Sequence, residues 1–245
     1  MPLPRFIKPA GFGVQSATDT LKPGLIAWYD FENYNDSSPN GYNLPTDNAG
    51  GSGNIVVNGK PGHCWDGRSF NYFNISTSSA LYAATAFTVS QSFTFACWVN
   101  VQAWQVPSSG GTAIINRADT SFNRHWGLNY FNGSLTFYVG DQTGAGITLA
   151  GLTDPPTNTW LCCIGWFDAE AKTVNLEVNG TLAQSSAFPG TGLYAGSNVL
   201  VIGNDVNFSG NQRLNGYLDT LAIWRTALSA EQRAAFYNNG NGRSY

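Results

Sequence analysis

The sequence predicts an all-β protein in which two antiparallel sheets pack face to face. Three observations support this: one strand that is apolar on both faces, about a dozen short strand-like segments in all, and turn residues between them. Only one segment, near the C-terminus, carries helix-capping signals. The 245 residues contain no obvious linker, and all-β sandwiches commonly reach this size as one domain.

The clearest strand pair lies within residues 159–180. Residues 160–167 (WLCCIGWF) place apolar or small side chains on both faces, which is typical of a strand in the middle of a sheet. In 173–178 the even-numbered residues are aliphatic and the odd-numbered ones polar, so this second strand is predicted to have one face in water. Asn179-Gly180 then favours a tight reversal into another strand.

The remaining strands are expected on both sides of this pair. They are predicted within 24–33, 55–67 (two short strands), 69–76, 92–101, 112–117, 125–131, 134–140, 199–204 and 217–225. Their tryptophans fill a core, and we assign Trp98, Trp160, Trp166 and Trp224 to it.

One helix is expected near the C-terminus. Ser229 and Gln232 form a capping box before AEQRAAFYNN, and Gly240 stands where a helix-terminating glycine belongs.

Residues 1–23 are predicted to form an extended N-terminal arm, because four prolines remove ladder donors and exclude a core strand. Its large apolar residues are Phe6, Ile7 and Phe12. Either this segment is a frayed terminus, or these three side chains dock the domain onto a neighbouring subunit.

The composition excludes several classes of partner. Only 11% of residues are charged, the net charge is -3 and no basic run occurs, so neither nucleic acid nor an anionic membrane is expected as a partner. No segment reaches the roughly 18 apolar residues of a membrane span, and the N-terminus lacks the apolar region of a secretory signal. The aromatic content of 14% suits either a homo-oligomer interface or a large monomer core.

The four cysteines are interpreted as buried thiols. Cys162 and Cys163 are neighbours in a strand and point to opposite faces, so they are not expected to pair with each other. A disulfide between Cys64 and Cys97 is the alternative.

Several segments follow one another in a familiar order: GLIAWYDFE, the polar loop at residues 36–44, SFTFACWVN, TWLCCIGWFDAEAKTVNLEVNG, LVIGN and LNGYLDTLAIWRTALSAEQRAAFYNNG. From about residue 24 to 243 the chain resembles the laminin-G-like group of the concanavalin A-like lectin/glucanase superfamily. The resemblance implies a jelly-roll sandwich for residues 24–245. It does not fix an activity, because this fold hosts enzymes, lectins and structural proteins. The tail YNNGNGRSY is similar to the ends of such domains in bacteriophage and environmental viral proteins.

The resemblance also implies a structural calcium site. By position its ligands are Asp36 and Asn40, in the loop after the first strand, and Asp219 in GYLDTL. Calcium prefers such carboxylate and amide oxygens. This chain departs from the family pattern by placing Pro39 where glycine is usual. The alternative is that Asp36 begins an Asx-type turn and Asp219 binds backbone amides.

Catalysis is not expected. Glycoside cleavage needs two carboxylates about 5–9 Å apart, and the sequence has no E-x-D-x-x-E or E-x-x-x-E run. It also has no G-x-S-x-G motif, and its two histidines are interpreted as loop or edge residues.

Sugar binding needs aromatic rings and polar groups on exposed loops, since pyranose faces stack and hydroxyls need donors and acceptors. Trp104 lies in one such loop, and 121–126 and 205–208 form others. The candidate ligand-binding residues are Trp104, Asn123, Arg124, Trp126 and Asp205.

Together these features favour a non-catalytic virion protein: a capsid decoration, fibre or tail-surface protein, made in the host cytoplasm and carried on the virion surface. Its arm would contact other virion proteins, and its sandwich would be able to bind host glycans. The alternatives are a secreted, extracellular lectin module and a glycoside-active enzyme.

Overall fold

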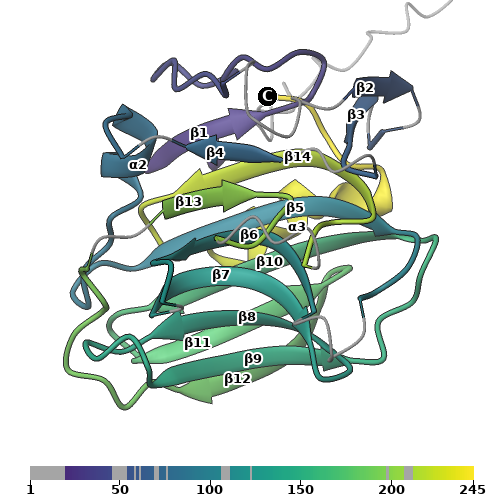
Figure 1. Cartoon of the computed structure of the whole chain (residues 1–245). Helices are drawn as coiled ribbons and strands as arrows, with labels where there is room; N and C mark the ends of the chain where they lie inside the picture. Colours follow the sequence, from purple (N-terminus) through teal and green to yellow (C-terminus); the bar gives the residue numbers. More distant parts are fainter. Residues whose placement is uncertain are drawn as a thin grey trace, which may run out of the picture.

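The structure is a computed structural model that describes residues 20–45, 54–57, 59–60, 62–68, 72–75, 77–105, 111–121, 123–196, 199–206 and 212–245. Within these residues two antiparallel sheets pack face to face (Figure 1). The predicted all-β sandwich is therefore confirmed.

Sheet A has the strand order β12-β11-β10-β5-β14-β3-β2, and β1 also pairs with β14. Its strands are β1 (Leu25–Tyr29), β2 (Asn54–Val57), β3 (His63–Asp66), β5 (Phe93–Val101), β10 (Trp160–Asp168), β11 (Thr173–Val178), β12 (Thr181–Ala187) and β14 (Gly216–Trp224). A bulge between Asp219 and Ala222 divides β14, so that its first part pairs with β3 and its second part with β1.

Sheet B has the order β4-β13-β6-β7-β8-β9. Its strands are β4 (Phe73–Ile75), β6 (Thr112–Ala118), β7 (Arg124–Phe131), β8 (Ser134–Gly140), β9 (Ile147–Thr153) and β13 (Val199–Ile202). The sequence patterns did not predict β9, because two of its outward-facing residues, Ile147 and Leu149, are apolar and hide the alternation. They also did not predict the short helix α2 (Ala80–Ala84).

The predicted central hairpin is confirmed: β10 lies between β5 and β11. Both faces of β10 are buried because the inter-sheet core covers one face and a second apolar cluster under helix α3 (Ala230–Tyr237) covers the other. The prediction that one face of β11 is exposed to water is wrong. Asn175 and Glu177 are buried, and Glu177 Oε2 accepts a hydrogen bond from Arg233 Nε of α3 at 2.8 Å.

Helix α3 begins as predicted, with reciprocal hydrogen bonds between Ser229 and Gln232. It ends at Asn238, which adopts a left-handed conformation (φ 49°), and not at Gly240. Its buried Phe236 packs edge-on against Trp28 and Trp224 of sheet A.

Three of the four tryptophans assigned to the core are buried, but Trp160 is only half-buried at the end of β10. The four cysteines are free thiols. Cys97 lies directly opposite Cys163 across β5 and β10, so the structure does not pair it with Cys64.

The described end of the predicted arm packs against the sandwich. Leu21 is buried in the cluster under α3, and its carbonyl accepts a hydrogen bond from Trp224 Nε1 at 2.7 Å. The three docking candidates, Phe6, Ile7 and Phe12, lie outside the described residues. No helix in the described ranges is long and apolar enough to cross a membrane.

The side chain of Arg117, near the C-terminal end of β6, is buried beside α2. Arg117 donates hydrogen bonds to the carbonyl of Tyr82 at 2.6 Å, to Thr85 Oγ1 at 3.0 Å and to His125 Nδ1 at 3.1 Å. His125 Nε2 bonds the carbonyl of Phe87 at 3.0 Å, so the imidazole is neutral with its proton on Nε2. Burial, and then the Arg117 charge, lower the pKa of His125 from 6.5 to about 3.

This histidine gives stability a predictable pH dependence. Unfolded His125 binds a proton near pH 6.5 and the folded protein excludes it until about pH 3, so its contribution is present above pH 6.5 and is lost as the pH falls. The expected slope in this window is about 1.4 kcal/mol per pH unit. Urea unfolding of wild type and His125→Gln between pH 7 and 4 measures it. The variant should show a shallower profile, and parallel profiles would refute this assignment.

Candidate functional site

A groove of about 640 Å³ opens on the outer face of sheet B, the face turned toward the viewer in Figure 1. Outward-facing side chains of β6, β7, β8 and β9 form its floor, and β12 and the segment after β13 complete it. It is lined by Asn116, Ala118, Arg124, Asn129, Phe131, Asn132, Ser134, Thr136, Tyr138, Ile147, Leu149, Gly151, Thr153, Gln184, Asp205, Val206 and Gln212.

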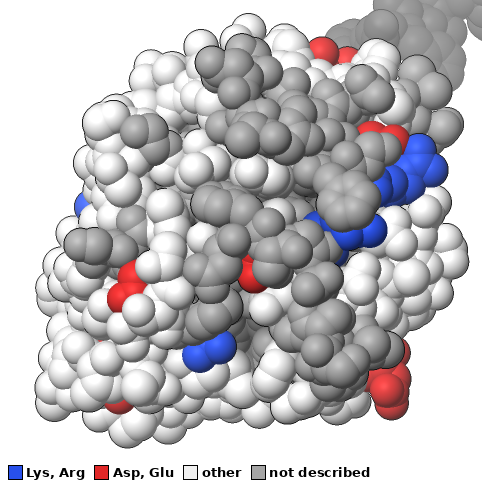
Figure 2. All heavy atoms as spheres, viewed as in Figure 1, with Lys and Arg blue, Asp and Glu red and all other residues white. Residues whose placement is uncertain are grey.

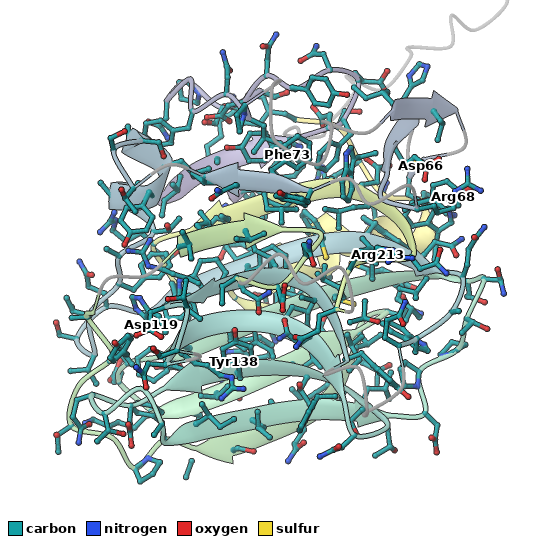
Figure 3. All side chains as sticks on the ribbon, viewed as in Figure 1. Asp66, Arg68, Phe73, Asp119, Tyr138 and Arg213 are labelled. Atoms are coloured by element: carbon teal, nitrogen blue, oxygen red, sulfur yellow. The ribbon has the colours of Figure 1, made fainter. Side chains whose placement is uncertain are left out.

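Tyr138 and a glycine shape the floor. Tyr138 extends from β8 across Gly127 of β7, where an added Cβ would come within 2.5 Å of the Tyr138 hydroxyl oxygen (Figure 3). The hydroxyl donates to Asn116 Oδ1 at 2.9 Å, and Asn116 Nδ2 donates to the carbonyl of Asn204 at 3.0 Å. Burial raises the pKa of the Tyr138 phenol, so the hydroxyl stays protonated as a donor. This network joins the floor to the segment after β13.

Three large apolar side chains are exposed in the groove: Phe131 at 46%, Ile147 at 38% and Leu149 at 39%. Among the described residues the only other large hydrophobic side chain this exposed is Leu182, at 54% on β12. Exposed apolar groups that share one face of a sheet indicate a binding surface, whereas single ones are ordinary.

Polar groups alternate with this apolar surface. Asn129 Oδ1 is buried in the groove and accepts no hydrogen bond, although a buried acceptor normally has a donor. Ser134 and Thr136 add hydroxyls from β8, and Gln184 Oε1 accepts from the Gly151 amide at 2.8 Å. Among the described residues on this face, Figure 2 shows more uncharged than charged surface. The groove therefore suits a ligand with many hydroxyls and apolar ring faces.

Two of the five predicted ligand-binding residues, Arg124 and Asp205, line this groove. Asn123 is held in the neighbouring loop, where its Nδ2 donates to Asp119 Oδ2 at 2.8 Å. Trp104 is half-buried outside the groove: it stacks on Tyr130 with ring centroids 4.7 Å apart, and its Nε1 donates to the carbonyl of Pro155.

The prediction for Trp126 is wrong. This residue lies within β7, not in the preceding loop, and its ring is fully buried in the inter-sheet core against Phe93 and Phe95. It cannot stack on a sugar at the surface. Sequence reasoning missed Phe131, Leu149 and Asn129, although Ser134, Thr136 and Tyr138 alternate in the sequence as an outward polar face of β8.

The predicted calcium ligands are already hydrogen-bonded within the chain. Asp36 Oδ1 accepts from the amides of Trp28 and Ser38, both at 2.9 Å, and Oδ2 accepts from Ser38 Oγ at 2.8 Å and the Tyr42 amide at 2.9 Å. Asn40 points its Nδ2 at the carbonyls of Leu25 and Ile26. Because three N–H donors and one O–H donor occupy the carboxylate that a cation needs, this loop does not fit a calcium cage.

Asp219 is likewise bound to backbone amides. Its Oδ1 accepts from the Thr220 amide at 2.6 Å and its Oδ2 from the Lys60 amide. Burial raises the pKa of Asp219 to about 8. In the part of the chain that the structure describes, no three His, Cys, Asp or Glu side chains gather as metal ligands.

Solved structures with the same fold include two toxin domains and one enzyme domain. The binding domain of Paraclostridial Mosquitocidal Protein 1 is 18% identical, with a TM-score of 0.68 over 90% of this chain and 53% of that one. The botulinum neurotoxin serotype D ligand-binding domain, in complex with N-acetylneuraminic acid, is 20% identical, with a TM-score of 0.64 over 91% and 52%. This chain thus spans about half of each toxin domain.

Domain 4 of AbnA, an extracellular arabinanase from Geobacillus stearothermophilus, in complex with arabinotriose, matches over nearly its whole length. It is 18% identical, with a TM-score of 0.60 over 89% of this chain and 98% of that domain. No curated protein sequence matches the chain significantly. A family model described as "Concanavalin A-like lectin/glucanases superfamily" matches residues 71–232, which is more than half of the chain. The chain therefore belongs to the concanavalin A-like lectin/glucanases superfamily.

Proposed function

We propose that this protein is a non-catalytic carbohydrate-binding domain and that a glycan lies in the groove on sheet B. The observation that carries this proposal is the composition of the groove: exposed Phe131, Ile147 and Leu149 lie beside amides and hydroxyls, including the unpaired Asn129 Oδ1. Apolar sugar faces pack on such side chains while sugar hydroxyls satisfy the polar groups. The structures solved with N-acetylneuraminic acid and with arabinotriose support a glycan ligand.

The small number of carboxylates in the groove favours binding without cleavage. Asp205 is the only carboxylate among the described lining residues, and it is 2% exposed. Glycoside hydrolysis ordinarily uses two carboxylates flanking the scissile bond. Release of reducing ends from any polysaccharide would overturn the non-catalytic assignment.

The setting that we favour is still the virion surface, with the N-terminal arm holding the domain to other virion proteins. This part of the proposal depends on the sequence features described above, since Phe6, Ile7 and Phe12 lie outside the described residues. A mass-spectrometric inventory of the source particle tests it, and absence of the protein from any particle would contradict it.

The groove itself is tested by a glycan array followed by calorimetry on the strongest ligand. Phe131→Ala should weaken binding by about 1–2 kcal/mol, or roughly 5–30-fold, because it removes an apolar contact surface. Leu182→Ala is the matched control, since Leu182 is as exposed but lies outside the groove. Equal effects of the two variants would exclude the groove, and an array without ligands would refute the proposed function.

A further inference from the structure

Two charged side chains line the groove among the described residues, and they differ in accessibility. Asp205 is 2% exposed and already interacts within the protein. Arg124 is half-buried, and no described residue forms a hydrogen bond or ion pair with its guanidinium. The charge that the groove offers to a ligand is therefore positive.

This is unusual among the arginines that the structure describes, because the others have protein partners. Arg68 binds Asp66 through two hydrogen bonds, Arg233 binds Glu177, and the buried Arg117 donates to backbone and side-chain acceptors. A guanidinium is a planar fork that matches a carboxylate in two parallel hydrogen bonds. Arg124 thus lacks the partner for which its chemistry is best suited.

The position of Arg124 defines where that partner would lie. In the sheet Arg124 is opposite Ala118 of β6, and a Cβ added to Gly140 at the end of β8 would meet the Arg124 carbonyl oxygen. Gly140 is paired with the exposed Ile147 of β9. Phe131 lies at the opposite end of β7, and the Ser134–Thr153 pair is at that same end. At about 3.3 Å per residue, the six intervals between the seven residues Ser134–Gly140 span roughly 20 Å. A ligand that reaches both ends is longer than one sugar.

We infer that Arg124 binds the carboxylate of an acidic sugar, so that the glycan in the groove is a carboxylated oligosaccharide. The carboxylated sugar unit of this oligosaccharide lies at the Arg124–Ile147 end of the groove. Its uncharged sugar units extend along β7 and β8 toward Phe131. Asn129 Oδ1, which has no hydrogen-bond donor in the protein, accepts a hydrogen bond from a sugar hydroxyl near the Phe131 end of the groove. This inference rests on the proposed function, because it names the ligand class of the same groove.

Calorimetry with the purified protein at low and high salt tests the inference. The probes are trigalacturonate and sialyllactose, each paired with its neutral counterpart, galactotriose and lactose. At low salt at least one acidic probe should bind about tenfold or more tightly than its counterpart, as expected for a charge-assisted hydrogen bond. The two acidic probes distinguish a uronate from a sialate as the source of the carboxylate.

Three variants test whether Arg124 causes the preference for acidic probes. Arg124→Gln should abolish the preference for the acidic probe, and Arg124→Lys should retain part of it, because lysine keeps the charge but not the fork. Arg225→Gln removes the same charge from a site outside the groove and should leave the preference unchanged. Circular dichroism and melting verify that each variant is folded.

The outcomes separate this inference from the proposed function. Equal binding of acidic and neutral probes that still depends on Phe131 would overturn the role of Arg124 and leave glycan binding intact. An equal loss of preference in Arg225→Gln would also overturn it, since long-range charge would then suffice. Absence of binding by every glycan on the array would refute both.

Discussion

Asp36→Ala is expected to lower the free energy of unfolding by about 3–5 kcal/mol. The buried carboxylate accepts four hydrogen bonds that fix the chain from Trp28 to Tyr42, and its removal leaves three backbone amides without acceptors. Each buried donor left unpaired costs about 1–3 kcal/mol. For a protein of this size each kcal/mol lowers Tm by about 2–4 °C, so the loss is measurable by thermal melting as well as by urea.

Asp168→Ala is the matched control. Asp168 also caps a turn, accepting from the amides of Glu170 and Ala171, but these bonds are exposed to water, which replaces them. Its loss should cost less than about 1 kcal/mol. Melting of the wild type with calcium and with a chelator should give the same Tm, because the Asp36 carboxylate is satisfied by its own loop. A chelator-induced drop that Asp36→Ala abolishes would contradict this account and restore the calcium site.

Gly165→Val is expected to destabilise the sandwich by more than about 3 kcal/mol or to prevent folding. Gly165 lies in β10 between Phe95 and Leu176, and an added Cβ would come within 2.4 Å of the Phe137 ring in the opposite sheet. Overpacking a dense core usually costs about 1–3 kcal/mol, and here a branched side chain meets a ring that is itself fully enclosed.

A second substitution separates overpacking from a general loss of the strand. Phe137→Ala alone leaves a cavity, yet combined with Gly165→Val it should be less destabilising than the sum of the two changes, because the valine occupies the vacated space. Gly192→Val is the control, since its added Cβ would approach only the Cβ of Gln142, at 3.2 Å. Additive effects in a urea-unfolding cycle would show that β10 and β8 do not face each other as described.

Local patterns predicted the central strand pair because both faces of β10 are apolar, and they predicted the reversal after β11 because Asn179-Gly180 is a specific turn sequence. Asn179 and Gly180 do adopt positive φ angles, of 52° and 76°, before β12. The same patterns failed for Glu177. A polar residue at this position would face water if the strand were alone, but here Arg233 of α3 covers it. Helix α3 follows about 50 residues later, and no local pattern reveals that it covers β11.

The groove could be predicted only in part, for a similar reason. Arg124 was identified from a polar loop, but Trp126, two residues further, is in the core because a bulge in β7 shifts the register between them. Phe131 and Leu149 come from different strands and look like core residues in the sequence. Only the pairing of β7, β8 and β9 shows that they share one exposed face.

The most direct test of glycan binding on sheet B is a crystal structure of the protein with the strongest array ligand. We expect the sugar on the outer face of β7, β8 and β9, with a ring against Phe131 or Leu149 and a hydroxyl bonded to Asn129 Oδ1. A glycan bound elsewhere, for example at Trp104 or on the α3 side of sheet A, with the groove on sheet B empty, would contradict the assignment.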